Sequence, residues 1–426
     1  MRATQVVRFA VLAFGAARGA AQQPQRIPVR TVTPPVRTDS GVIHSVSALR
    51  VLSTGDALLL DKTRQRLVLF DSTLKRCRTL ADTATGAPSP FPSGIAALLP
   101  YVGDSSVFVD VDARALIIVE PTGRFGRVMA PAKAGDLGYL SFSPNANAGF
   151  TPQGRMYYRT YRNLRPSPAP AIVPDGSGIV GIRYGPDSAP IIRADLEKRR
   201  VDTFAMLHVP QDKWVTISLR PGTSIARGAV NPLPQTDEWA IMPDGTIAIV
   251  RGQDYHIDWI SPDGQLRSTS KMPFDWKQIP LEERQRLIDS LKKADSVRRV
   301  KNPPPPPEPG REASNFNRLP FVTVDAAELP DYYPPVRAGQ VFASPDGTVW
   351  ILPTTSLLST GDITGSLTAS TGGLVYDVVN RSGVIVERVR LPEKRALVGL
   401  GLGGVVYMNY APAPGVVYLE RARIRR

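Results

Sequence analysis

The chain has 426 residues, of which 42% are hydrophobic and 21% charged, and its formal net charge is +14. This composition fits a globular protein and argues against a disordered chain. The basic residues are dispersed, and no basic motif is interleaved with aromatic side chains, so the pattern argues against a nucleic-acid partner. It favours simple solubility or adsorption to an anionic envelope surface. The single cysteine, Cys77, cannot form an intramolecular disulfide.

The first 21 residues predict a signal peptide. Arg2 and Arg8 precede an apolar run over residues 9–17, and small residues follow at 19–21. That run is too short to span a bilayer. We therefore expect export to the periplasm or beyond, with no transmembrane segment in residues 22–426; a short N-terminal anchor or an unstructured arm is the alternative.

A unit of a glycine-containing turn followed by a strand-like apolar run recurs six times along the chain. The runs are TGDALLLD at Thr54, GDSSVFVDV at Gly103, PQGRMYYRTY at Pro152, PDGTIAIVRG at Pro243, PDGTVWILPT at Pro345 and LGGVVYMNY at Leu402. They are rich in β-branched and aromatic residues and alternate little, which is typical of strands buried on both faces. Each is followed by a second run of the same kind, so the two Pro-Asp-Gly triplets around Asp254 and His256 are interpreted as turns between strands.

The spacing of the turn glycines predicts the number of repeats. The intervals between Gly55, Gly103, Gly154, Gly245, Gly347 and Gly404 are 48, 51, 91, 102 and 57 residues. The short intervals match one four-stranded propeller blade each, and the long ones indicate insertions. We predict an all-β, six-bladed β-propeller over residues 22–426; seven blades is the alternative, with an extra blade beginning at residues 174–184.

The last repeat has only three strand-like runs. Residues 26–32, RIPVRTV, are predicted to supply its missing outer strand, because a chain end that completes the final sheet removes exposed edges.

These turn motifs resemble those of six-bladed β-propellers of the NHL and TolB-like superfamily, and in particular exported bacterial propellers. The resemblance covers nearly all of residues 22–426 and implies the fold more strongly than any activity. The superfamily includes binding scaffolds, lactonases and other hydrolases. Its lactonase-like members hold a divalent cation with acidic and amide side chains near the axis, and no such set is assigned here.

Loop lengths predict which edge of the propeller carries function. Loops between second and third strands, and crossings between blades, share one edge, and four long segments fall there: residues 162–189, 209–234, 274–334 and 354–373. The third is an insertion between blades 4 and 5 that holds a predicted helix over residues 281–300, with an apolar stripe of Leu287, Ile288, Leu291, Ala294 and Val297. We expect this helix to pack on the edge of the propeller, and a lid is the alternative. The proline-rich residues 301–310 predict an extended spacer.

No known catalytic motif is present, and the three histidines lie far apart, so no metal site and no cofactor are predicted. A ligand site is predicted where second strands reach the elaborated edge. Its candidate residues are Asp61, Asp110, Arg159, Arg251, Asp254, His256, Asn409 and Tyr410. Their mixture of charge and hydrogen-bonding types suits a protein or a small polar or anionic ligand. The leading hypothesis is an exported binding or interaction scaffold, and the alternative is a metal-assisted hydrolase or lactonase-like enzyme.

Overall fold

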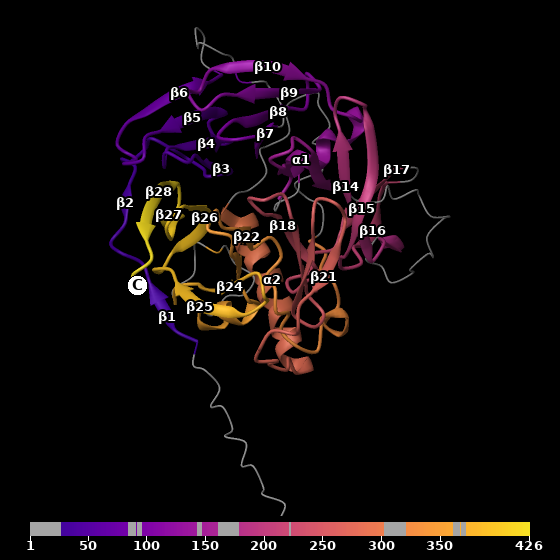
Figure 1. The fold of residues 1–426 in the computed structure, drawn as a ribbon. Coiled ribbons are helices and arrows are strands. Elements are labelled where there is room, and N and C mark those ends of the chain that lie inside the picture. Colours follow the sequence, from indigo (N-terminus) through magenta and orange to yellow (C-terminus); the bar gives the residue numbers. More distant parts are fainter. Residues whose placement is uncertain are drawn as a thin grey trace, which may run out of the picture.

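The structure is a computed structural model that describes residues 27–83, 91, 96–142, 147–160, 179–220, 223–301, 321–360, 367 and 372–426. It consists mainly of strands in several small sheets arranged around a centre (Figure 1), as in a β-propeller. The predicted all-β class is therefore confirmed. The predicted signal peptide and the proline-rich residues 302–310 lie outside the described residues.

Six of the sheets are antiparallel meanders whose first strand lies nearest the centre (Figure 1). The first two are β3 (Ala48–Val51), β4 (Ala57–Asp61), β5 (Arg66–Phe70), β6 (Cys77–Ala81), and β7 (Ala96–Pro100), β8 (Ser106–Asp110), β9 (Ala115–Val119), β10 (Phe125–Met129). The third and fourth are β11 (Gly149–Phe150), β12 (Met156–Arg159), β14 (Ser188–Asp195), β15 (Arg200–His208), and β18 (Glu238–Ile241), β19 (Ile247–Arg251), β20 (His256–Ile260), β21 (Leu266–Ser268). The fifth and sixth contain β22 (Val341–Ala343), β23 (Val349–Ile351), β24 (Val375–Val379), β25 (Ile385–Arg390), and β26 (Arg395–Gly401), β27 (Val405–Ala413), β28 (Val416–Arg423).

The second strands β4 and β8 are buried on both faces because a neighbouring sheet covers each face. All five residues of β4 and of β8 are buried. Leu59 of β4 packs in one cluster with Tyr407 of β27, whereas its neighbour Leu60 packs in another with Phe108 of β8. Burying a leucine in this way contributes roughly 1.5–3 kcal/mol. Near-continuous apolar runs are thus what this packing requires.

The predicted Pro-Asp-Gly turns are present. Gly245 has φ +88°, and its N–H donates to the carbonyl of Met242 at 2.8 Å. Asp244 accepts a hydrogen bond from the N–H of Thr246 at 3.0 Å, which fixes the turn before β19. A glycine is needed because a side chain disfavours positive φ, and a Cβ there would lie 2.9 Å from Gln153.

The N-terminal segment corrects the prediction for residues 26–32. Within it, β1 (Val29–Thr31) pairs in parallel with β25 of the fifth sheet, whereas β2 (Val36–Arg37) pairs with β28 and becomes the outer strand of the sixth. The extended chain passes from one sheet to the next, and the N–H of Thr33 donates to the carbonyl of Arg423 at 2.8 Å. It therefore satisfies backbone groups on two outer edges that would otherwise be unpaired.

All four long segments follow a second strand or connect consecutive sheets, which places them at one edge of the propeller, here called the elaborated rim. The segments at 162–189 and 209–234 are not only loops. They supply β13 (Ile179–Tyr184), β16 (Lys213–Arg220) and β17 (Thr223–Gly228), which form a separate three-stranded sheet. The segment considered for an extra blade thus begins this small sheet, whose partners come from a different insertion.

The insertion before the fifth sheet contains α2 (Leu281–Lys301), close to its predicted bounds. Its buried Ile288 packs against Val324, Ala326 and Leu329. The predicted apolar stripe is wrong in its second half, because Ala294 is exposed and Val297 is 46% exposed, whereas Asp295 is buried. The first half of the helix therefore packs against an apolar surface, whereas the second half does not. Two further short helices are α1 (Leu137–Phe142) and η1 (Ala134–Asp136) beside the third sheet.

Two 3-10 helices complete the rim: η3 (Ala326–Glu328) and η4 (Thr354–Thr360). Lys213 of β16 lies 2.9 Å from carboxylate oxygens of both Asp325 and Glu328, so the three-stranded sheet is tied to the helical insertion. Among the described helices, none is long and apolar enough to cross a membrane.

Candidate functional site

Asp61, at the end of β4, is fully buried and organises the loop that follows it. Its carboxylate accepts hydrogen bonds from the N–H of His44 at 2.9 Å and from the hydroxyl of Ser45 at 2.8 Å. Arg66 lies 3.5 Å away as an ion-pair partner. Each oxygen therefore has a partner within the protein, and the arrangement stabilises the loop.

Asp110 and Arg159 end the second strands of the next two sheets. Asp110 is buried and accepts a hydrogen bond from the N–H of Ala113 at 2.9 Å, which closes the β8–β9 turn. The charge of Arg159 acts on two carboxyls, lowering the pKa values of Asp212 and Glu238 against the stronger effect of burial. Arg159 thus lies near acidic groups at the starts of β16 and β18.

Arg251, at the end of β19, is held by two buried carboxylates. Its guanidinium donates to Asp237 and to Asp258, each at 2.7 Å. Burial alone would lower the pKa of Arg251, but these hydrogen bonds raise it above its ordinary value. A glycine is required at position 252. Its N–H donates to Asp237 at 2.9 Å, and a Cβ there would collide with the carbonyl oxygen of Thr236.

His256 lies between two carboxylates of the same sheet. Its Nδ1 is 2.6 Å from Asp254 and its Nε2 is 3.3 Å from Asp258. Burial would raise the pKa of Asp254, but His256 and Lys271, which is 3.4 Å away, lower it. Together with Arg251 and Asp237 these residues form the fourth-sheet cluster. Each of its carboxylates has a basic neighbour, and the intervening Tyr255 is buried and donates to Asp377 at 2.8 Å.

Asn409 and Tyr410 are neighbours on β27 but face opposite sides of the sixth sheet. The ring of Tyr410 stacks on Tyr418 at 5.9 Å, and the guanidinium of Arg395 lies 3.9 Å above it. Arg395 also pairs with the buried Glu420 at 2.6 Å. The side-chain oxygen of Asn409 is buried without a hydrogen-bond partner. The eight predicted residues are therefore distributed over five sheets.

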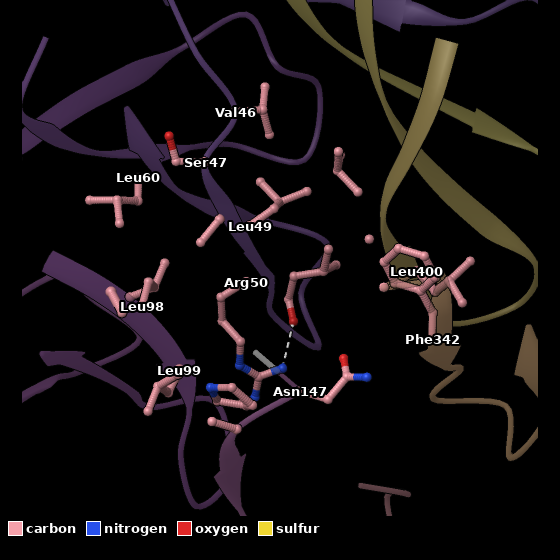
Figure 2. A pocket seen from close by; sticks show the side chains of 18 of the residues that line it. Val46, Ser47, Leu49, Arg50, Leu60, Leu98, Leu99, Asn147, Phe342 and Leu400 are labelled. Carbon is pink, nitrogen blue, oxygen red and sulfur yellow. Dashed lines mark hydrogen bonds between the residues drawn. The ribbon is translucent and has the colours of Figure 1, made fainter. Parts of the chain in front are cut away.

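The space that the sheets do share is a central cavity of about 500 Å³. It is lined by the first strands β3, β7, β18, β22 and β26 and by the residues just before β11. Figure 2 shows Leu49, Leu98, Leu99, Phe342 and Leu400 around it. We call this cavity the channel. Its volume lies within the range that holds small ligands, roughly 300–1,000 Å³, and none of the eight predicted residues lines it.

Most side chains that line the channel are apolar, although polar atoms, including those of the backbone, make up about half of its exposed surface. The polar side chains that line it are Ser47, Arg50, Lys62, Asn147 and Gln340. Gln340 accepts a hydrogen bond from Tyr376 at 2.9 Å. Asn147 donates to the carbonyls of Trp239 and Val341, so its amide joins the inner edges of the fourth and fifth sheets. Both amides therefore have protein partners.

Arg50 is the channel's most distinctive polar residue. It donates to the carbonyls of Val51 and Gly103 at 3.0 and 2.9 Å, but its Nε is buried without a partner. Burial lowers the pKa of Arg50, opposed by the charge of Asp104. That carboxylate is already bound by the N–H and hydroxyl of Ser53. The guanidinium extends toward Leu99 and Asn147 in Figure 2.

Glu238 begins β18, beside the channel. It is 1% exposed; one carboxyl oxygen accepts from the N–H of Gly339 at 3.0 Å and the other has no partner. Burial raises its pKa from 4.5 to about 7, although Arg159 and Gly339 lower it. This acid was not singled out in the sequence because it lies in an apolar strand with no motif around it.

A divalent-cation site does not fit the described channel. Oxygen-rich cation sites use several carboxylates, yet no Asp or Glu is among the described residues lining the channel. Nor does the described part of the chain contain a group of three or more His, Cys, Asp or Glu side chains placed to hold a metal.

No known protein family and no curated protein sequence matches the chain. Among solved structures, it is similar to a DUF4221 family member from Bacteroides vulgatus with a TM-score of 0.51 and 9% identity, over 93% of this chain and 98% of that one. Virginiamycin B lyase from Staphylococcus aureus gives 0.39 and 8%, over 92% and 99%. A gluconolactonase from Xanthomonas campestris gives 0.35 and 10%, over 92% and 98%. At these identities the likeness concerns the propeller-type fold alone.

Proposed function

We propose that this protein is an exported, six-bladed β-propeller that acts as a binding scaffold and holds its ligand in the central channel. The observation that carries the proposal is the channel itself, a cavity of about 500 Å³ in which most of the lining side chains are apolar. Such cavities with a few placed polar groups are the usual form of small-molecule sites. Export follows from the character of residues 1–21.

Six blades and a closed ring are supported by the clusters of buried side chains. Each of six clusters joins one sheet to the next, and the cluster of Leu59 and Tyr407 joins the first to the last. The pairing of β2 with β28 brings the start of the chain into the last sheet. An experimentally determined structure with an open ring would overturn this part of the proposal.

A neutral apolar dye tests ligand binding in the channel. We expect Nile red to bind the protein at one site with enhanced fluorescence. Leu400→Trp, which fills part of the channel, should weaken binding about tenfold or more because buried apolar contacts are lost. The matched control is Leu402→Trp, since Leu402 is 55% exposed and does not line the channel. Equal binding by the two variants, with unchanged thermal stability, would contradict the proposal.

A second candidate is adsorption to an anionic envelope surface, favoured by the exposed second half of α2. Three lysines are exposed there, Lys292, Lys293 and Lys301, and none of the three forms an ion pair with another described residue. Sedimentation with phosphatidylglycerol vesicles tests it: binding should disappear in moderate salt, which screens surface charges, and in the double variant Lys292→Glu/Lys293→Glu. Vesicle binding that survives both changes would exclude this surface.

A further inference from the structure

The register of the sheets shows that Arg50 interrupts an otherwise apolar level of the channel. In each of the six sheets, the first and second strands form a hairpin, and one residue pair lies directly next to its turn. In the first sheet this pair is Val51 and Ala57. The residues one position earlier on the first strands are Arg50, Leu99, Gly149, Ala240, Phe342 and Leu400. All but Gly149 line the cavity, so one cation lies in a ring of uncharged residues.

Arg50 lacks a carboxylate of its own. No acidic oxygen of the described residues lies within ion-pair distance of it, and the nearby Asp104 is bound to Ser53. Within the described part of the chain the guanidinium donates to two backbone carbonyls, and its Nε has no partner. A half-buried cation in apolar surroundings is costly unless an anion offsets its desolvation.

We infer that the channel binds an amphipathic anion: a molecule with one hydrocarbon chain and an oxyanion head group such as a carboxylate. This inference rests on the proposed function, because it assigns the ligand class of the same channel. The head group accepts charge-assisted hydrogen bonds from Arg50, at the end of β3 near the tight turns. The chain lies along the apolar side chains of the wall toward the elaborated rim, past residues such as Leu49 and Leu98.

Lys62 is the other cation that lines the channel. It follows β4, at the elaborated rim, and therefore lies toward the opposite end from Arg50. Burial lowers its pKa, and it has an interaction within the protein. An amphipathic anion could therefore bind in either of two orientations, with its head group at Arg50 or at Lys62. Separate variants of the two residues distinguish these orientations.

Displacement of Nile red by three molecules of equal chain length tests the inference. Dodecanoate, dodecanol and dodecyltrimethylammonium are each titrated below the concentrations at which they form micelles. We expect dodecanoate to displace the dye at a concentration about tenfold or more below dodecanol, and the cation to be weakest, because a charged hydrogen bond adds that much affinity. In Arg50→Met the preference for dodecanoate over dodecanol should vanish, and Arg50→Lys should retain part of it.

The controls separate this inference from the proposed function. Arg124→Met removes an exposed arginine near a tight turn, and Lys62→Met removes the other channel cation; both should keep the preference. If dodecanoate and dodecanol compete equally in the wild-type protein, the ligand class is wrong although the channel still binds. If the preference is lost in Lys62→Met and kept in Arg50→Met, the head group is misplaced. If Nile red ignores Leu400→Trp, the proposed function itself fails.

Discussion

The elaborated rim and the central channel differ in whether their charged side chains have partners of opposite charge. At the rim, Arg251 is bound to two buried carboxylates at 2.7 Å, and His256 lies between Asp254 and Asp258. In the channel, Arg50 has no carboxylate within ion-pair distance among the described residues. Residues that look functional in the sequence because they cluster are thus the ones that have ionisable partners within the fold. The unmatched charge lies where the sequence shows only an arginine in an apolar strand.

This difference indicates how each region contributes. Paired charges at strand ends order loops and join sheets, so their removal should change stability. An unpaired charge in a cavity wall does not stabilise the folded state, so its removal should change binding rather than cause a loss of stability. The following substitutions test that division, beginning with the largest expected effect.

Glu420→Gln should be the most destabilising change. Glu420 is 1% exposed and pairs with Arg395 at 2.6 Å, so the variant leaves a cation without its counter-charge, at a cost of about 3–5 kcal/mol. Urea unfolding followed by tryptophan fluorescence measures it. The matched control Glu120→Gln disrupts the exposed pair with Arg124 and should leave the midpoint unchanged.

Glu238→Gln should raise stability at high pH. Because the pKa of Glu238 is about 7 in the folded protein and ordinarily 4.5, the folded state holds more protons between these values, and stability falls as pH rises through that window. The loss amounts to at most about 3 kcal/mol. Gln keeps an acceptor for Gly339, so the difference in unfolding free energy between pH 5 and pH 8 should shrink. An unchanged pH dependence would place the titration elsewhere.

Tyr255→Phe should have an intermediate effect. The variant removes a hydrogen bond to the buried Asp377, which still pairs with Arg388 at 2.8 Å. We expect a loss of about 1–2 kcal/mol in thermal unfolding experiments. Nile red affinity should stay the same, because neither residue lines the channel. A parallel loss of affinity would show that the rim and the channel are coupled.

Asp254→Asn should have the smallest effect. Its side chain is 35% exposed, and surface ion pairs contribute below about 1 kcal/mol. Dodecanoate binding should be unaffected, whereas a loss of binding at unchanged stability would restore Asp254 and His256 as ligand residues. Competition titrations with this variant and wild type decide between these outcomes.

Much of the fold could be predicted because it depends on local signals. Turn glycines with positive φ, such as Gly55 and Gly245, and apolar runs buried on both faces mark the hairpins directly. The route of the N-terminal segment could not be predicted, since residues 29–31 and 36–37 are short extended pieces that fit either outer edge. The second half of α2 was misjudged for a related reason: Val297 continues an apolar spacing, but no neighbour covers it.

The candidate site shows the same limit more sharply. The sequence by itself determined most strands of the propeller sheets, their turns and the edge that carries the insertions, because each depends on residues close in the chain, but it missed the separate sheet of β13, β16 and β17. It placed polar residues at strand ends but not their partners, which for Arg251 include Asp237, and for Arg395, Glu420. Only the tertiary structure decided which charges are paired, because partners such as Arg395 and Glu420 lie on different strands whose register the sequence does not state. It likewise decided that Arg50 faces a shared cavity, since that cavity exists only when the first strands of separate sheets meet.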